Sequence, residues 1–170
     1  MAAPQAPPQP AAIALGSNLG ESLATLEGAL AHLDGLPGVR VRARSHWYRS
    51  AAVGPVQPDY INGCALLEVG LSPEALLDHL HATEHRYGRV RRERWGARTL
   101  DLDLILYGSL QLERSGLQVP HPRFRERAFV LLPLAEIAPA WIDPLTGRTV
   151  ADLASTVGGR HTVHLLEAAP

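Results

Sequence analysis

The spacing of apolar residues along the chain predicts both strands and helices, without a strict alternation of the two. Residues 11–15 form a short apolar run before Gly16, which is typical of a buried strand. Leucines then recur every three or four residues through 19–33, which predicts a helix that ends at Gly35. The intervening segment 16–20 reads Gly-Ser-Asn-Leu-Gly. It has neither the lysine of a P-loop nor the G-x-G-x-x-G pattern, so we interpret it as a structural turn and not as a phosphate loop.

The next segments predict two strands that are separated by a loop. Residues 39–47 alternate apolar and basic side chains, which indicates a half-exposed strand with a basic outer face. Residues 48–59 contain one glycine and two prolines, and we expect a loop long enough to have a functional role. The pattern of residues 60–69 predicts a further strand, with Tyr60 and Asn62 on one of its faces.

The rest of the chain adds a helix, a strand and a mixed C-terminal part. Ser72-Pro73-Glu74 is a helix start, and Gly88 is placed to end that helix. Residues 100–106 read as a strand, 107–117 as a hairpin connection, 125–137 as a helix, and 143–170 as a turn, a short helix and a final apolar run. The order β-α-β-β-α-β predicts an α+β fold of the ferredoxin-like kind, with helices on one face of the sheet plus C-terminal additions.

The segment 88–106 carries the most unusual chemistry of the chain. Five arginines and one tryptophan run directly into the strand that carries Asp101 and Asp103; they are Arg89, Arg91, Arg92, Arg94, Trp95 and Arg98. Because side chains alternate along a strand, the two carboxylates share one face, about 6.6 Å apart at Cα, while Leu100, Leu102, Leu104 and Leu106 take the other.

Two interpretations fit these acidic residues. The first is a solvated acidic face on an amphipathic strand. The second is a Mg²⁺ site, since this ion takes a few carboxylate oxygens and completes its shell with water and substrate phosphates. The neighbouring arginines favour the second, because guanidinium groups bind phosphates bidentately and magnesium with arginine is typical of phosphoryl-transfer sites.

Composition narrows the class of protein. The 170 residues carry a net charge of −1 and 46% hydrophobic residues, which fits one domain over 11–170 preceded by a disordered Ala/Pro/Gln tail over 1–10. The basic cluster is local, so we expect no nucleic-acid partner. No apolar stretch is long enough for a membrane span and the start is not a signal peptide. The single cysteine, Cys64, excludes an internal disulfide, and we expect a cytoplasmic monomer.

Four motifs occur in a fixed order along the chain. They are Gly16-Ser17-Asn18-x-Gly20, Gly54-Pro55-x-x-Pro58-Asp59-Tyr60-x-Asn62, Arg94-Trp95-Gly96-x-Arg98-Thr99-x-Asp101-x-Asp103 and Val119-Pro120-His121-Pro122. Together they resemble the motifs of the 6-hydroxymethyl-7,8-dihydropterin pyrophosphokinases of folate biosynthesis. The resemblance extends over residues 11–166, and its third motif is too long and chemically unusual to expect by chance.

The resemblance implies an enzyme that transfers pyrophosphate from ATP to the pterin hydroxymethyl group and releases AMP. It implies that Asp101 and Asp103 bind two Mg²⁺ ions that bridge the ATP phosphates. It further implies that Arg89 and Arg98 neutralise charge that develops at the β-phosphate. The nucleotide-binding residues that it implies are Glu84, Arg91, Arg94, Leu104, His121 and Arg127.

The resemblance also implies a pterin pocket. Tyr60 and Phe129 would sandwich the ring, and the Asn62 amide would recognise its pyrimidine edge. Ser50 and Val53 would complete the pocket, with Trp95 closing over it. No residue stands out as a general base, and either Asp103 or the metal ions alone could activate the hydroxyl group.

Some residues depart from the family pattern. Ala51 and Ala52 replace a proline-rich step, and Pro122 replaces an aromatic residue. Gln118 and His81 also differ from the frequent choices, so the nucleotide contacts are the part of the site most affected. Two other classes fit the pattern less well: a metal-dependent nucleic-acid enzyme, and a nucleotide-binding regulator without catalytic activity.

Overall fold

The computed structural model describes residues 7–51, 56–88 and 99–166. Its elements are β1 (Gln9–Ser17), α1 (Ser22–Asp34), β2 (Val39–Arg44), β3 (Tyr48–Ser50), β4 (Tyr60–Val69), α2 (Pro73–Arg86), β5 (Asp101–Tyr107), β6 (Leu112–Arg114), β7 (Leu117–Val119), the 3₁₀ turn η1 (Phe124–Glu126), α3 (Ala128–Ile137), α4 (Val150–Thr156), the 3₁₀ turn η2 (Arg160–Thr162) and β8 (Val163–Leu165). Within these described ranges, no helix is long and apolar enough to cross a bilayer.

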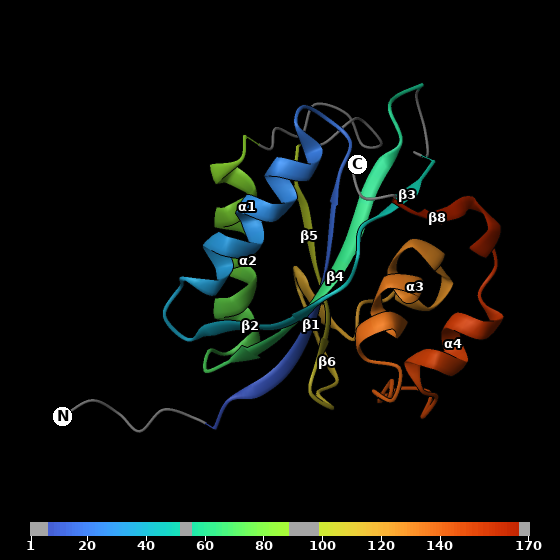
Figure 1. The fold of residues 1–170 in the computed structure, drawn as a ribbon. Coiled ribbons are helices and arrows are strands. Elements are labelled where there is room, and N and C mark those ends of the chain that lie inside the picture. The colour runs from blue at the N-terminus through green and yellow to red at the C-terminus, as the bar shows by residue number, and fades with distance from the viewer. Residues whose placement is uncertain (1–6, 52–55, 89–98, 167–170) are drawn as a thin grey trace.

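One antiparallel sheet organises the chain. Its strand order is β5-β1-β4-β3-β8, and β2 also pairs with β4. The four strands β5, β1, β4 and β2, together with α1 and α2, form the β-α-β-β-α-β arrangement that the sequence predicts. Helices α1 and α2 cover one face, and the C-terminal helices α3 and α4 cover the other (Figure 1). The α+β prediction is therefore confirmed, and the C-terminal additions form a second layer.

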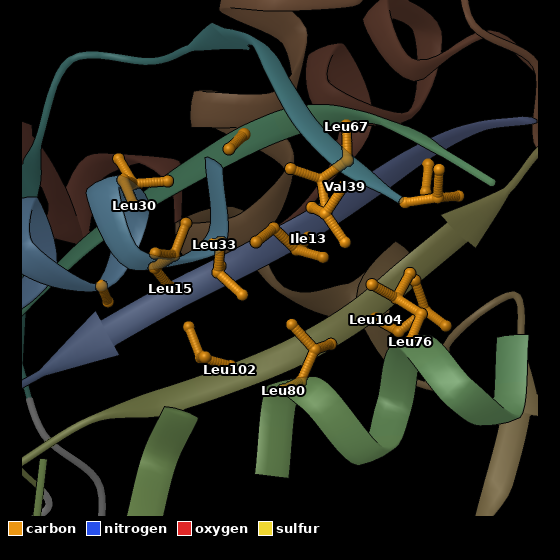
Figure 2. Close-up of a cluster of buried hydrophobic side chains, with 14 of the residues drawn as sticks. Ile13, Leu15, Leu30, Leu33, Val39, Leu67, Leu76, Leu80, Leu102 and Leu104 are labelled. Atoms are coloured by element: carbon orange, nitrogen blue, oxygen red, sulfur yellow. The ribbon is translucent and has the colours of Figure 1, made fainter. Parts of the chain in front are cut away.

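The larger apolar core lies between the sheet and helices α1 and α2. Ile13 and Leu15 of β1 meet Leu33 of α1, while Leu80 of α2 packs toward Leu102 of β5 (Figure 2). These five side chains are at most 3% exposed. Burial of each contributes about 1.5–3 kcal/mol, so this core fixes α2 against the edge strand β5.

A second apolar cluster lies on the opposite face of the sheet. Val130, Leu131 and Leu134 of α3 pack there against strand residues that include Ala12 and Cys64. Helix α3 lies against β4, where Cys64 Sγ donates to the backbone carbonyl of Val130 (3.4 Å). The beginning of α3 is thereby held beside β4.

Helix α2 starts and ends as the sequence predicts. The Ser72 hydroxyl accepts a hydrogen bond from the backbone N–H of Ala75 (3.1 Å), and Pro73 occupies the first turn. After the helix, Gly88 adopts a left-handed conformation with φ of 79°. These signals fix the length of a helix that supplies one wall of the candidate site.

Three sequence-based boundaries are wrong. Strand β1 begins at Gln9, so residues 9 and 10 belong to the sheet and not to the predicted tail, since they pair with Val69 and Glu68. Residues 48–50 form β3 and not the start of a loop, because the long strand β4 offers pairing positions beyond β2. The helix expected over 125–137 begins only at Ala128, after the separate turn η1.

The predicted leucine face of β5 needs one correction. Leu100, Leu102 and Leu104 belong to the larger core, as expected, but Leu106 packs in the second cluster. The register against β1 shifts between Ala12 and Ile13, which oppose Leu106 and Leu104 respectively. This bulge inserts one extra residue, so the side chains beyond it change faces.

Candidate active site

One cleft of about 700 Å³ collects the described residues that the sequence singled out as site residues. All ten of them line it: Ser50, Tyr60, Asn62, Glu84, Asp101, Asp103, Leu104, His121, Arg127 and Phe129. The remaining predicted site residues, Val53, Arg89, Arg91, Arg94, Trp95 and Arg98, lie outside the described residues. The cleft therefore brings together candidate site residues from β3, β4, α2, β5 and the segment 121–129.

The two aspartates lie side by side on the floor of this cleft. Asp101 and Asp103 are both half-buried, while the alternate leucines of β5 are buried in the core. On β1 they face Gly16 and Ala14, whose small side chains leave the floor open. The prediction that the two carboxylates share one face of the strand is confirmed.

A third carboxylate fixes the strand that carries the pair. Glu84 of α2 is only 4% exposed, and its Oε2 accepts a hydrogen bond from the backbone N–H of Leu102 (2.9 Å). This bond joins the last turn of α2 to β5 between the two aspartates. It sets the position of both acidic side chains relative to the helix.

The donor set fits magnesium better than a softer metal. Within the described residues, no three His, Cys, Asp or Glu side chains gather into a metal-binding group. Asp101 and Asp103 instead offer hard oxygen ligands from one strand, beside an open cleft. Mg²⁺ retains several waters and takes other ligands from substrate phosphates, so two carboxylates suffice.

Arg127 brings a fixed positive charge to the acidic pair. Its Nη1 lies 3.9 Å from Asp103 Oδ2, and its Cζ lies 5.6 Å from the centre of the Phe129 ring. The backbone carbonyl of Arg127 accepts hydrogen bonds from the N–H groups of Val130 and Leu131, so it is anchored to the first turn of α3. Arg127 thus connects the acidic part of the cleft with an aromatic wall.

The opposite end of the cleft combines an aromatic surface with the side-chain amide of Asn62, whose orientation is fixed by a hydrogen bond. Asn62 is 5% exposed, and its Nδ2 donates to Ser50 Oγ (2.7 Å) across the β3–β4 pair. Tyr60, two residues before it on β4, also lines the cleft, as does Phe129 from α3. A flat heterocycle with an amide-like edge suits such a surface. Its ring can stack on the aromatic side chains, and hydrogen bonds to the Asn62 amide can fix its orientation.

His121 enters the cleft with its protonation state fixed by its surroundings. The backbone N–H of Arg123 donates to His121 Nδ1 (3.1 Å), so this nitrogen has no proton and Nε2 carries one. Burial lowers the pKa of His121 to about 4, and the positive charge of Arg127 acts in the same direction. The imidazole is therefore neutral near pH 7 and acts as a hydrogen-bond donor through Nε2.

Several lining residues were not predicted as site residues. Gly16 was interpreted as part of a structural turn, but a Cβ at this position would lie 3.3 Å from Asn62 Oδ1. Leu77 could have been found, since it precedes His81 and Glu84 on the same helix face. Arg114 comes from β6 and is held by Glu74 (2.5 Å) at the edge of the cleft.

Four of the five residues that depart from the family pattern line this cleft. Ala51, His81, Gln118 and Pro122 all line the cleft, whereas Ala52 lies outside the described residues. These departures therefore lie in the same cleft as the candidate ligand-binding residues.

Comparison with known proteins identifies the family. Residues 12–139 match the family described as 7,8-dihydro-6-hydroxymethylpterin-pyrophosphokinase (HPPK). The chain belongs to the HPPK family. It is 54% identical over 147 residues to a 2-amino-4-hydroxy-6-hydroxymethyldihydropteridine pyrophosphokinase of Synechocystis, covering 86% of this chain and 75% of that protein. A protein of the same name from Pseudomonas aeruginosa is 44% identical over 159 residues, covering 93% and 90%.

Solved structures support the fold of this HPPK-family chain. It superimposes on a chain titled HPPK-DHPS in complex with substrates with a TM-score of 0.74 at 10% identity, over 96% of this chain and 47% of that one. For Plasmodium falciparum HPPK-DHPS the TM-score is 0.68 at 12% identity, over 87% and 41%. The chain thus spans about half the length of these solved chains, and the likeness concerns the fold.

Proposed function

We propose that this chain transfers the pyrophosphoryl group of ATP to the hydroxymethyl group of 6-hydroxymethyl-7,8-dihydropterin and releases AMP. The observation that carries the proposal is the arrangement within one cleft. In the sheet, β1 lies between β5, which carries Asp101 and Asp103, and β4, which carries Tyr60 and Asn62, and all four side chains line the cleft. A metal-loaded triphosphate at the acidic pair would therefore meet a heterocycle bound at the aromatic end.

The aromatic end would orient the acceptor. Tyr60 and Phe129 would stack on the two faces of the pterin, while the Asn62 amide pairs with its pyrimidine edge. Since Ser50 holds the Asn62 side chain, the amide direction is set before the substrate arrives. Such fixed orientation is a major source of rate, because the hydroxymethyl oxygen must attack the β-phosphorus in line with the leaving group.

The other end would hold the nucleotide and its charge. His121 would donate its Nε2–H to a phosphate oxygen, and Arg127 would offset negative charge beside Asp103. The family resemblance implies the same task for Arg89, Arg91, Arg94 and Arg98, and a place in the pterin pocket for Trp95 and Val53. Two Mg²⁺ ions held by Asp101 and Asp103 would supply the positive charge that shields the phosphates.

In bond terms, the pterin hydroxyl oxygen forms a bond to the β-phosphorus of ATP. The bond between the β-phosphorus and the oxygen of the α-phosphate breaks, AMP leaves with that oxygen, and the hydroxyl proton passes to solvent. Pterin diphosphate and AMP form in equal amounts.

Chromatography of products tests this function. The purified chain is mixed with ATP, Mg²⁺ and the reduced pterin alcohol, and AMP and pterin diphosphate are quantified together. We expect equal amounts of the two products, and neither when the pterin is omitted or EDTA is added. Formation of ADP, or of AMP without the pterin, would contradict the proposal.

We also expect the chain to act as a cytoplasmic monomer. The absence of a disulfide partner for Cys64 in the sequence is the basis for the compartment. Light scattering after size-exclusion chromatography tests the oligomeric state, and a mass of twice 18.4 kDa would contradict it.

A further inference from the structure

A buried ion pair joins Arg125 and Asp143, and neither residue lines the cleft. Asp143 follows α3 and is fully buried, whereas the Arg125 side chain in η1 is 22% exposed. Arg125 Nε donates to Asp143 Oδ2 (2.5 Å) and Nη2 donates to Oδ1 (2.8 Å). Two parallel bonds of this kind fix the direction of the guanidinium as well as its distance.

Both carboxylate oxygens of Asp143 accept two hydrogen bonds each. Besides Arg125, the backbone N–H of Leu145 donates to Oδ1 (3.0 Å) and the Thr146 hydroxyl donates to Oδ2 (2.7 Å). Burial alone would raise the pKa of Asp143, but the bonds from Arg125, Thr146 and Leu145 outweigh it and lower the pKa to about 2. Asp143 is therefore charged at any working pH, and the pair is permanent.

The pair clamps the chain on both sides of α3. Arg125 precedes this helix and Asp143 follows it, so their bond closes the segment 125–143 around it. The guanidinium of Arg125 also lies over the buried ring of Phe124, 4.8 Å from its centre. Its position is thus set by an aromatic face on one side and by the 143–148 turn on the other.

This clamp lies directly beside two candidate site residues. The backbone N–H of Arg127 donates to the carbonyl of Phe124 (3.2 Å), so the joint between η1 and α3 has little freedom. Arg127 reaches Asp103 from this joint, and Phe129, the second residue of α3, lines the cleft. A shift of η1 would therefore displace both of these cleft residues.

Holding the helix on the sheet does not require the pair. Val130, Leu131 and Leu134 are at most 1% exposed and already bury the inner face of α3. Apolar burial holds a helix but tolerates small sliding, whereas a buried bidentate ion pair selects one position. The pair is thus suited to setting the fine position of the η1–α3 joint.

We propose that Arg125 and Asp143 are positioning residues for the reaction, acting through Arg127 and Phe129. The inference rests on the proposed function. It predicts that loss of the pair weakens pterin binding and lowers kcat even in protein that is fully folded. A misplacement of about 1 Å can cost on the order of 100-fold in rate.

The test compares a single with a double variant. Arg125→Met leaves a buried carboxylate without its cation, and we expect Tm to fall by about 10 °C. The double variant Arg125→Met with Asp143→Asn removes the lone charge and keeps an acceptor for the Leu145 N–H, so its Tm should recover by at least half. Arg148→Met, which breaks the exposed pair with Asp152 in the same C-terminal segment, is the matched control.

Kinetics well below each Tm then separate positioning from stability. In the double variant we expect kcat to fall at least about 10-fold and the KM for pterin to rise, because both cleft residues move. A smaller folded fraction would reduce the apparent kcat but leave KM unchanged. A double variant with kcat and both KM values within twofold of wild type overturns the inference.

Two further results complete the test. If the double variant does not fold, Arg125→Lys decides, since it keeps the charge but not the bidentate geometry: a raised pterin KM supports the inference, and wild-type kinetics overturn it. A wild-type chain that forms no AMP overturns the proposed function itself, which distinguishes that failure from failure of the positioning role alone.

Discussion

Exchange of His121 for two different amides tests how this residue acts in the cleft. The backbone N–H of Arg123 occupies Nδ1, so only Nε2 can donate to a ligand. Glutamine places its amide nitrogen near the position of imidazole Nε2, whereas asparagine places it near that of Nδ1. His121→Gln should therefore keep the donor and His121→Asn should lose it.

The size of the effect follows from the kind of hydrogen bond that is lost. A hydrogen bond to a charged group contributes about 1.5–3 kcal/mol, which corresponds to about 10- to 150-fold in rate. We expect kcat/KM for ATP to fall by this factor in His121→Asn and by only a few-fold in His121→Gln. Steady-state measurement of AMP release at saturating pterin gives both values. If His121→Asn is as active as His121→Gln, the assigned tautomer is wrong.

The same histidine predicts a pH dependence with a definite sign. Its pKa in the folded protein, about 4, is below the ordinary value of 6.5, so between these values the unfolded chain binds more protons than the folded one. The free energy of unfolding should fall as the pH is lowered from 6.5 to 4, and urea titrations should show a smaller fall in His121→Gln. Equal slopes in the two proteins would contradict a neutral, buried imidazole.

Three further predictions concern the floor of the cleft and the core. Asp103→Asn should keep the circular dichroism spectrum but retain less than about a tenth of kcat, a loss of at least about 1.4 kcal/mol, and higher activity would contradict a metal-binding role. Gly16→Ala places a methyl group 3.3 Å from Asn62 Oδ1 and should raise the pterin KM several-fold while the ATP KM stays unchanged; Gly158→Ala, with open space around it, is the control. Burial raises the pKa of the Cys64 thiol, so a thiol reagent at pH 8 should react only after unfolding, and rapid reaction of the native chain would refute the packing of α3.

Local patterns were sufficient for much of the site. The alternation along β5 placed Asp101 and Asp103 on one face, because a strand has a period of two over such a short stretch. The Ser72 cap and Gly88 fixed the ends of α2, since both act within a single turn. Family motifs, and not periodicity, supplied the roles of residues such as Asn62.

Features that depend on the neighbouring strand could not be predicted from the sequence. The bulge that turns Leu106 to the second cluster is a property of the register between β5 and β1. The role of Gly16 appears only when the sheet brings it opposite Asn62 on β4 and Asp101 on β5. Likewise, no local pattern joins Arg125 to Asp143 across the whole of α3.

The central claim is that the acidic pair directs the β-phosphorus of ATP to an acceptor bound at the aromatic end of the same cleft. Turnover with ATP that is isotopically labelled in either the α- or the β-phosphate tests it most directly. We expect the β label to appear wholly in the pterin diphosphate and the α label wholly in AMP. Label from the α-phosphate in the pterin product, or β label released as free pyrophosphate, would contradict it.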